Sequence, residues 1–188
     1  MSTGGDNTGP AAQTDIAVLI GDGTVARHWV LDPASSHVEF HVKHFWGVIT
    51  VNGSFGKITG EGNVDADGAV RGWVRMDANS LTTKNKKRDA HLRSADFFDV
   101  ENHSQVVVTV NSLKLTGPMT LVCHGTLEAA GKTKPIQFNA QVSDATTEAV
   151  TISAELVLDR REFSMTWSPL DMASYTARAT VVARFVRG

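Results

Sequence analysis

Apolar and polar residues alternate along most of this chain, and this pattern constrains the fold more than any other feature. In the segment SHVEFHVKH, the apolar residues Val38, Phe40 and Val42 alternate with polar ones. A period of two is typical of strands with one apolar and one polar face, so we expect an all-β fold. The same period recurs in further segments around residues 70–77, 105–111, 136–142, 151–159 and 177–185.

Turn signals between these segments indicate how the strands are joined. Asn52-Gly53 and Asp67-Gly68 are pairs that favour tight hairpins, and residues 129–135 predict a somewhat longer connection. Strands joined at such close spacing are antiparallel, and about eight of them fit the chain length. Closing the sheet removes its exposed edges, which favours an antiparallel β-barrel. A two-sheet sandwich is the competing architecture.

The beginning of the chain differs from the rest. The first dozen residues are rich in Gly, Ser, Thr, Asn and Pro, and we expect a flexible tail over residues 1–24 followed by one barrel domain over residues 25–188. No Lys or Arg precedes Arg27, and the apolar run Ile16–Ile20 is too short for a signal peptide. No stretch approaches the roughly 20 apolar residues of a spanning helix. These observations predict a cytoplasmic protein without a membrane span.

Charge and cysteine content narrow the possible partners. The formal net charge of −2 gives no reason to expect nucleic acid or an anionic membrane surface as partner. Cys123 is the only cysteine, which excludes an intramolecular disulfide. Its place in an apolar segment favours a small buried residue over a reactive thiol.

The segment 84–99 breaks the alternation in the middle of the chain. Leu92, Ala95 and Phe97 or Phe98 recur every three to four residues, which predicts a short helix with one apolar stripe. Ser94 offers an alternative start for a second helical turn. We expect a helix-bearing loop that covers one end of the barrel and that is placed to act as a lid over an apolar interior.

Several motifs resemble those of the YceI-like family, whose members are small lipocalin-like barrels associated with polyisoprenoid and related lipids. The resemblance runs from about residue 28 to 187 and follows WVLDPASSHVEFHVKH, VNGSFGKITGEGNVD and SLTTKNKKRDAHLRSADFFDV. It continues in GTLEAAGKTKPIQF and LDRREFSM, although Ser164 stands where the family usually has Gly. The resemblance implies a long apolar cavity. It also implies that Arg88, Asp89 and His91 anchor the helical loop through an ion pair and hydrogen bonds.

The residues themselves lean toward a cavity rather than a filled core. Ala154, Ala177, Ala179 and Ala183 are small inward candidates on the last strands, and small residues leave volume inside a barrel of this size. A linear isoprenoid chain would fill that volume by apolar burial. Together with the resemblance, this predicts the following lining residues: Phe40, Val42, His44, Phe55, Val74, Met76, Leu92, Phe97, Phe98, Val108, Leu121, Phe138, Leu156, Phe163, Met165 and Trp167.

The sequence offers little support for catalysis. His37 and His41 share a face of one strand but lie about 13 Å apart, too far to bind one ion. The chain has no His-x-His motif, no cysteine pair and no Gly-x-Ser-x-Gly elbow. We expect no catalytic residue, metal or cofactor. His44 lies on the apolar side of its strand, as a hydrogen-bonded core residue or as a contact for a polar lipid head group.

The expected function is binding, sequestration or transport of a long-chain isoprenoid lipid, either a polyisoprenoid or an isoprenoid quinone. Two alternatives stay open. One is an enzyme acting on such lipids, with His44 and His91 in polar roles, and the other is a structural barrel with a filled core. A homodimer is also possible, because the resemblance allows it.

Overall fold

The computed structural model describes residues 17, 20, 23 and 25–188. The predicted flexible tail of residues 1–24 therefore lies almost wholly outside the described residues. The described part contains one longer helix, α2 (Lys86–Arg93), and eleven strands. The strands are β1 (His28–Leu31), β2 (His37–His44), β3 (Ile49–Phe55), β4 (Ile58–Val64), β5 (Val70–Asp77), β6 (Leu81–Thr82), β7 (Gln105–Gly117), β8 (Thr120–Ala129), β9 (Lys132–Ser143), β10 (Ala149–Asp159) and β11 (Ala173–Arg187).

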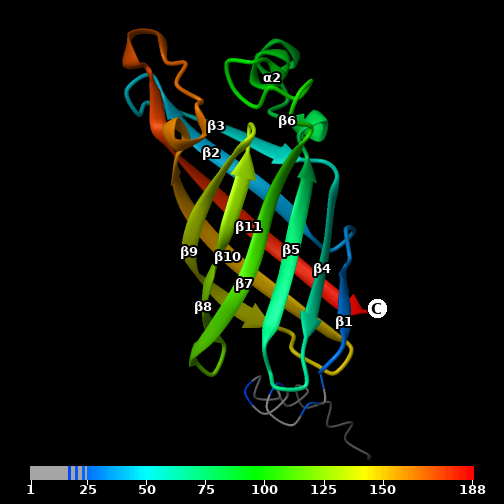
Figure 1. The fold of residues 1–188 in the computed structure, drawn as a ribbon. Coiled ribbons are helices and arrows are strands. Elements are labelled where there is room, and N and C mark those ends of the chain that lie inside the picture. Colours follow the sequence, from blue (N-terminus) through cyan, green and yellow to red (C-terminus); the bar gives the residue numbers. More distant parts are fainter. Residues whose placement is uncertain (1–16, 18–19, 21–22, 24) are drawn as a thin grey trace, which may run out of the picture.

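All eleven strands belong to one antiparallel sheet that closes on itself (Figure 1). Closure comes from β1, which pairs with β4 on one side and with the end of β11 on the other, for example at Val30 and Val186. Three pairs of short strands lie end to end: β1 with β2, β3 with β4, and β5 with β6. Each pair takes the place of one strand in the barrel. Counted this way, the barrel has eight strands. The predicted barrel is confirmed, and the sandwich is excluded.

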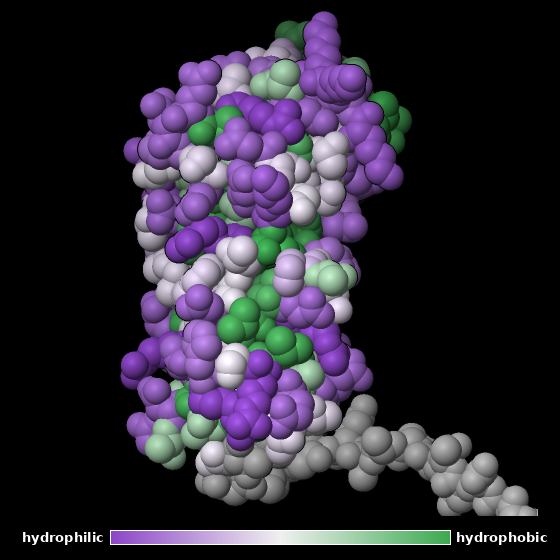
Figure 2. Space-filling view, turned by 90° about the vertical axis from the view of Figure 1, so that its right-hand side faces the viewer, coloured by the Kyte–Doolittle hydropathy of each residue, from purple (hydrophilic) through white to green (hydrophobic). Residues whose placement is uncertain are grey.

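The alternation predicted from the sequence sorts side chains between the interior and the surface. In β8, Leu121 and Cys123 are buried, whereas Thr120 and His124 are exposed. The burial of Cys123 agrees with its predicted role, and it raises the pKa of the thiol to about 11. On the face shown in Figure 2, hydrophilic residues predominate and hydrophobic ones gather in a strip along the middle of the barrel.

Of the three predicted connections, one is confirmed, one is shorter than expected and one is wrong. Asn52-Gly53 lies inside β3 rather than in a turn. Glycine is needed at position 53 for packing, because a Cβ there would come within 2.2 Å of the Phe40 ring. The hairpin between β2 and β3 instead occupies residues 45–48. The expected longer connection at 129–135 is a tight turn at Ala130 and Gly131, which both have positive φ. Gly68, with φ of 81°, forms the predicted turn between β4 and β5.

The helix and two loops lie together at one end of the barrel (Figure 1). The two loops are the β2–β3 hairpin and the connection between β10 and β11, which contains the short 3₁₀ turns η2 (Arg160–Phe163) and η3 (Pro169–Asp171). A third 3₁₀ turn, η1 (Ala78–Ser80), joins β5 to β6. None of the described helices is long and apolar enough to cross a membrane.

Candidate functional site

The barrel interior contains two adjoining apolar cavities. One has a volume of about 210 Å³ and lies beside α2; we call it the α2-side cavity. The other has a volume of about 190 Å³, and we call it the far cavity. Neither reaches the roughly 300 Å³ of an ordinary ligand pocket, whereas the two joined do. They share a ring of lining residues, which we call the waist: Val38, Met76, Val108, Leu156 and Val181.

Every predicted lining residue lies against one of these cavities, although a role in ligand binding stays a prediction. The waist contributes Met76, Val108 and Leu156, and Val74, Leu121 and Phe138 line the far cavity. The remaining ten line the α2-side cavity: Phe40, Val42, His44, Phe55, Leu92, Phe97, Phe98, Phe163, Met165 and Trp167. The four small alanines also line cavities, Ala154 and Ala183 in the far one and Ala177 and Ala179 beside α2.

A cluster of aromatic rings closes the α2 end of the interior. The centroid of the Phe98 ring lies 5.9 Å from that of Phe55 and 6.5 Å from that of Phe40. The helix itself ends at Arg93, so Phe98 is carried by the turn that follows. The predicted single helical stripe is therefore divided between α2 and this turn. Edge-on and tilted pairs of this kind are favourable beyond the area they bury.

A second aromatic group joins the helical loop to the β10–β11 connection. The ring of His91 meets the edge of Trp167 at 4.5 Å and of Phe97 at 5.1 Å between centroids. His91 Nε2 also lies 2.9 Å from Asp96 Oδ2, within hydrogen-bond distance. His91 thus links two segments that border the α2-side cavity.

Asp89 and Arg88 hold the start of the helix through Thr83. Asp89 is buried, and its carboxylate accepts hydrogen bonds from Thr83 N at 2.7 Å, Thr83 Oγ1 at 2.5 Å and Thr82 Oγ1 at 3.2 Å. Burial raises the pKa of this carboxyl, but the hydrogen bonds outweigh burial and hold the pKa below its ordinary value.

The expected ion pair between Arg88 and Asp89 is absent from the described residues. Arg88 instead donates from Nε to Thr83 Oγ1 at 2.7 Å and from Nη2 to the Thr83 carbonyl at 3.0 Å. Neighbouring helical residues point in different directions, so a shared partner satisfies both side chains better than a direct contact. The predicted hydrogen bonds are present, but the ion-pair prediction is wrong.

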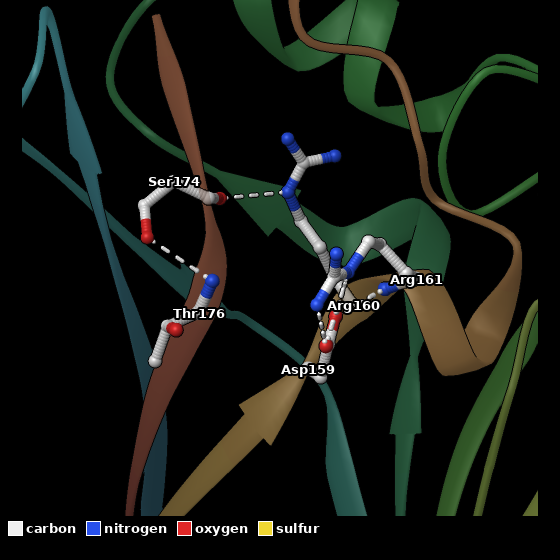
Figure 3. Close-up of polar contacts among 5 residues, drawn as sticks. All are labelled: Asp159, Arg160, Arg161, Ser174 and Thr176. Atoms are coloured by element: carbon white, nitrogen blue, oxygen red, sulfur yellow. Dashed lines mark hydrogen bonds and ion pairs between the residues drawn. The ribbon is translucent and has the colours of Figure 1, made fainter. Parts of the chain in front are cut away.

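Arg160 organises the β10–β11 connection, and sequence reasoning missed it. This buried guanidinium donates to the Ser174 carbonyl at 2.9 Å (Figure 3). It also donates to the carbonyls of Trp167, at 2.9 Å, Ala173 and Met165. Burial lowers the pKa of Arg160 from its ordinary value. The signal was present in LDRREFSM, where an arginine ends a strand and precedes a break in alternation.

Two neighbours of Arg160 complete this corner. Arg161 donates hydrogen bonds to the Asp159 carboxylate, as Figure 3 shows. These hydrogen bonds lower the pKa of Asp159 to about 2. Ser164 has φ of 63°, the left-handed conformation that glycine adopts most easily. The usual glycine of the related motif would relieve this strain.

Within the predicted lining, His44 is the one described residue with a buried side-chain nitrogen that makes no hydrogen bond. Its Nδ1 is buried without a hydrogen bond, and the ring borders the α2-side cavity. The sequence predicts that His44 is either a hydrogen-bonded core residue or a contact for a polar lipid head group. Because Nδ1 makes no hydrogen bond, the first role is not seen at this atom. Among the described residues, no three His, Cys, Asp or Glu side chains lie close enough to hold a metal ion.

Solved structures of low sequence identity share this fold. The Burkholderia cenocepacia protein BcnA is 18% identical, with a TM-score of 0.74 over 82% of this chain and 98% of its own. A polyisoprenoid binding domain from Saccharophagus degradans is 18% identical, with a TM-score of 0.71 over 85% of this chain and 98% of its own. A Campylobacter jejuni YceI protein is 22% identical, with a TM-score of 0.63 over 73% and 85%.

Sequence comparison gives closer relatives. A UPF0312 protein of Vibrio cholerae is 33% identical over 62% of this chain, and the match spans 63% of that protein's length. A UPF0312 protein of Ectopseudomonas mendocina is 32% identical over 66% of this chain and 67% of its own length. The family model for the YceI-like domain matches residues 29–185, nearly the whole barrel. The chain therefore belongs to the YceI-like domain family, as its motifs predict.

Proposed function

We propose that this protein binds one long-chain apolar lipid, a polyisoprenoid or an isoprenoid quinone, inside the barrel and sequesters or transports it. The observation that carries the proposal is the pair of adjoining apolar cavities that meet at the waist. An interior made of two joined cavities and lined almost only by apolar groups suits a linear hydrocarbon. One structural neighbour is described as a polyisoprenoid binding domain, which supports the same class of ligand.

The energetics favour an extended chain over a compact molecule. Apolar surface removed from water contributes roughly 25 cal/mol per Å², so a chain that crosses the waist and fills both cavities gains more than one confined to a single cavity. Val108 and Leu156 at the waist can still move aside for a ligand, because side chains packed in a protein interior also hop between rotamers. Passage of a flexible chain requires only such local movement.

The polar groups beside the α2-side cavity favour binding without turnover. Arg160 donates its hydrogen bonds to backbone carbonyls, and Arg88 and Asp89 are both hydrogen-bonded to Thr83. A general acid or base needs a free donor or acceptor aimed at the substrate. His44 offers a buried, unpartnered Nδ1, which suits a hydrogen bond to the head group of a quinone or a similar lipid.

The test is native mass spectrometry of the purified protein, followed by solvent extraction and identification of any released lipid. We expect one isoprenoid lipid for each chain, or binding of added polyprenol and quinone by an empty protein. The variant Ala179→Phe fills part of the α2-side cavity and should lower the bound fraction. Val157→Phe adds the same ring to an exposed position on β10 and should leave binding unchanged.

An empty protein that binds neither added lipid would contradict the proposal and favour a structural barrel. Release of a chemically altered lipid after incubation would instead favour the enzyme alternative.

A further inference from the structure

Exposed apolar side chains gather at one end of the molecule. Among the described residues, most of the exposed large hydrophobic side chains lie in the β2–β3 hairpin or the β10–β11 connection. Trp46, Val48 and Leu170 are 72%, 84% and 81% exposed. We call these two segments, residues 45–49 and 167–171, the rim tips.

The two rim tips are neighbours, and both border the α2-side cavity. Ala173, just after one tip, pairs with His44, just before the other. His44 and Trp167 both line that cavity, and Trp167 also contacts His91 of α2. Figure 1 shows both loops at the same end of the barrel as α2.

Backbone strain indicates that the tips are not shaped for stability. Phe45, Trp46 and Leu170 have φ of 51°, 53° and 52°, in the left-handed region that bulky residues rarely adopt. Asn or Gly would form such turns with less strain, and polar residues would be better solvated. Strain and exposed aromatic surface together are typical of a contact with a partner.

Exposed lysines lie at the same end of the barrel as the tips. Lys43 precedes the hairpin, and Lys84, Lys86 and Lys87 are exposed at the start of α2. The acidic residue within a tip, Asp171, accepts a hydrogen bond from the Tyr175 hydroxyl at 3.0 Å. Exposed carboxylates also lie at this end, on Asp96 after α2 and on Glu162 in the β10–β11 connection.

We propose that the rim tips dock onto the surface of a lipid bilayer that carries anionic head groups. Trp, Phe and Leu side chains flanked by lysines are the composition that binds membrane interfaces, where apolar groups enter the acyl boundary and cations meet anionic lipids. Docking would bring the α2-side cavity to the membrane, the reservoir of any long-chain lipid. The purpose of docking rests on the proposed function, but its physical basis is the exposed surface itself.

The test is flotation of the full chain with vesicles of phosphatidylcholine, alone and mixed with phosphatidylglycerol. The wild type should float with the mixed vesicles and bind the neutral ones more weakly. The triple variant Trp46→Ser, Val48→Ser, Leu170→Ser should bind at least tenfold more weakly, because each buried apolar side chain contributes strongly to partitioning. Val157→Ser removes an equally apolar exposed residue from the barrel wall and should bind like the wild type.

Fluorescence tests the same contact without destabilising the fold. Trp46 is mostly exposed, so its emission should shift to shorter wavelength when mixed vesicles are added, and most of this shift should vanish in Trp46→Phe. Failure of the wild type to float, or flotation of the triple variant like the wild type, overturns the proposal. A third result would also overturn it: the wild type forms a dimer but binds no vesicles, and the triple variant is a monomer. The tips would then pair two copies of this chain.

Failure of the proposed function is a separate outcome. If the protein binds vesicles through Trp46 but extracts no polyprenol or quinone from them, the docking surface is supported and the carrier role is contradicted. A protein that takes up these lipids from detergent but ignores vesicles keeps the carrier role and loses the docking surface.

Discussion

Single residues fix the two segments that border the α2-side cavity, and Asp89 is the clearest case. We expect Asp89→Asn to lower the free energy of unfolding by about 1–3 kcal/mol near neutral pH, because an amide replaces an acceptor oxygen with a donor that faces the donors of Thr82 and Thr83. Urea unfolding would measure the loss, with the exposed Asp96→Asn as control. Equal loss in both variants would contradict the role given to Asp89.

The effect of Asp89 should also depend on pH. Since the folded pKa lies below the ordinary value of 3.8, the folded protein binds this proton less readily than the unfolded chain does. The stabilisation is complete above that value and is lost as the pH falls through the folded pKa. The stability difference between wild type and Asp89→Asn should therefore narrow below about pH 3.8 and stay constant above it.

Arg160 has the same importance for the β10–β11 connection. Arg160→Met leaves four backbone carbonyls without their donor and should lower the free energy of unfolding by about 3 kcal/mol or more. Arg160→Lys should recover only part of the loss, because one ammonium cannot reach all four carbonyls. Arg161→Met, at an exposed neighbour, should change little. Thermal unfolding of the three variants would test this order, and full recovery by lysine would contradict it.

At the scale of elements, Gly53 lets strands β2 and β3 pack closely, because the Phe40 ring lies directly over it. Gly53→Ala in β3 should destabilise the protein by about 1–3 kcal/mol, because the new methyl group collides with the Phe40 ring of β2. Gly62→Ala in β4 is the matched control, since its nearest atom would be 3.6 Å away, an ordinary contact. Adding Phe40→Leu should partly rescue Gly53→Ala in a double-mutant cycle. Absence of any coupling would show that the strands relax around the methyl group.

The helical loop should control the release of a bound lipid. Phe98→Ala removes two ring contacts, to Phe40 and Phe55, and each such pair contributes about 0.5–1.5 kcal/mol. We expect about tenfold faster dissociation, measured by transfer of a fluorescent polyprenyl lipid to acceptor vesicles. Phe138→Ala enlarges the far cavity by the same amount but leaves the loop intact. Equal acceleration by both variants would assign the effect to cavity volume rather than to the loop.

For the whole molecule, local pattern predicted the architecture but not the long-range contacts. The alternation of Val38, Phe40 and Val42 is a property of neighbours in sequence, and it placed β2 and the barrel correctly. Gly53 misled because a glycine required by packing looks the same in a sequence as a glycine required by a turn. Arg160 was missed because two of its carbonyl partners, Ala173 and Ser174, lie on β11 and meet it only after β10 and β11 have paired.

The waist decides whether the interior acts as one site or two. Val181→Phe adds a ring where the α2-side and far cavities meet, so it should separate them without filling either one. Short prenyl chains fit within a single cavity and should keep their affinity, whereas long chains should bind less tightly. Titration of a series of prenyl alcohols of increasing length would measure this.

Val157→Phe, outside the barrel, should leave the length dependence unchanged. If Val181→Phe weakens short and long chains alike, the cavities collapse together and the ligand does not cross the waist. If it weakens only long chains, the length of the two joined cavities sets the length of lipid that the protein prefers.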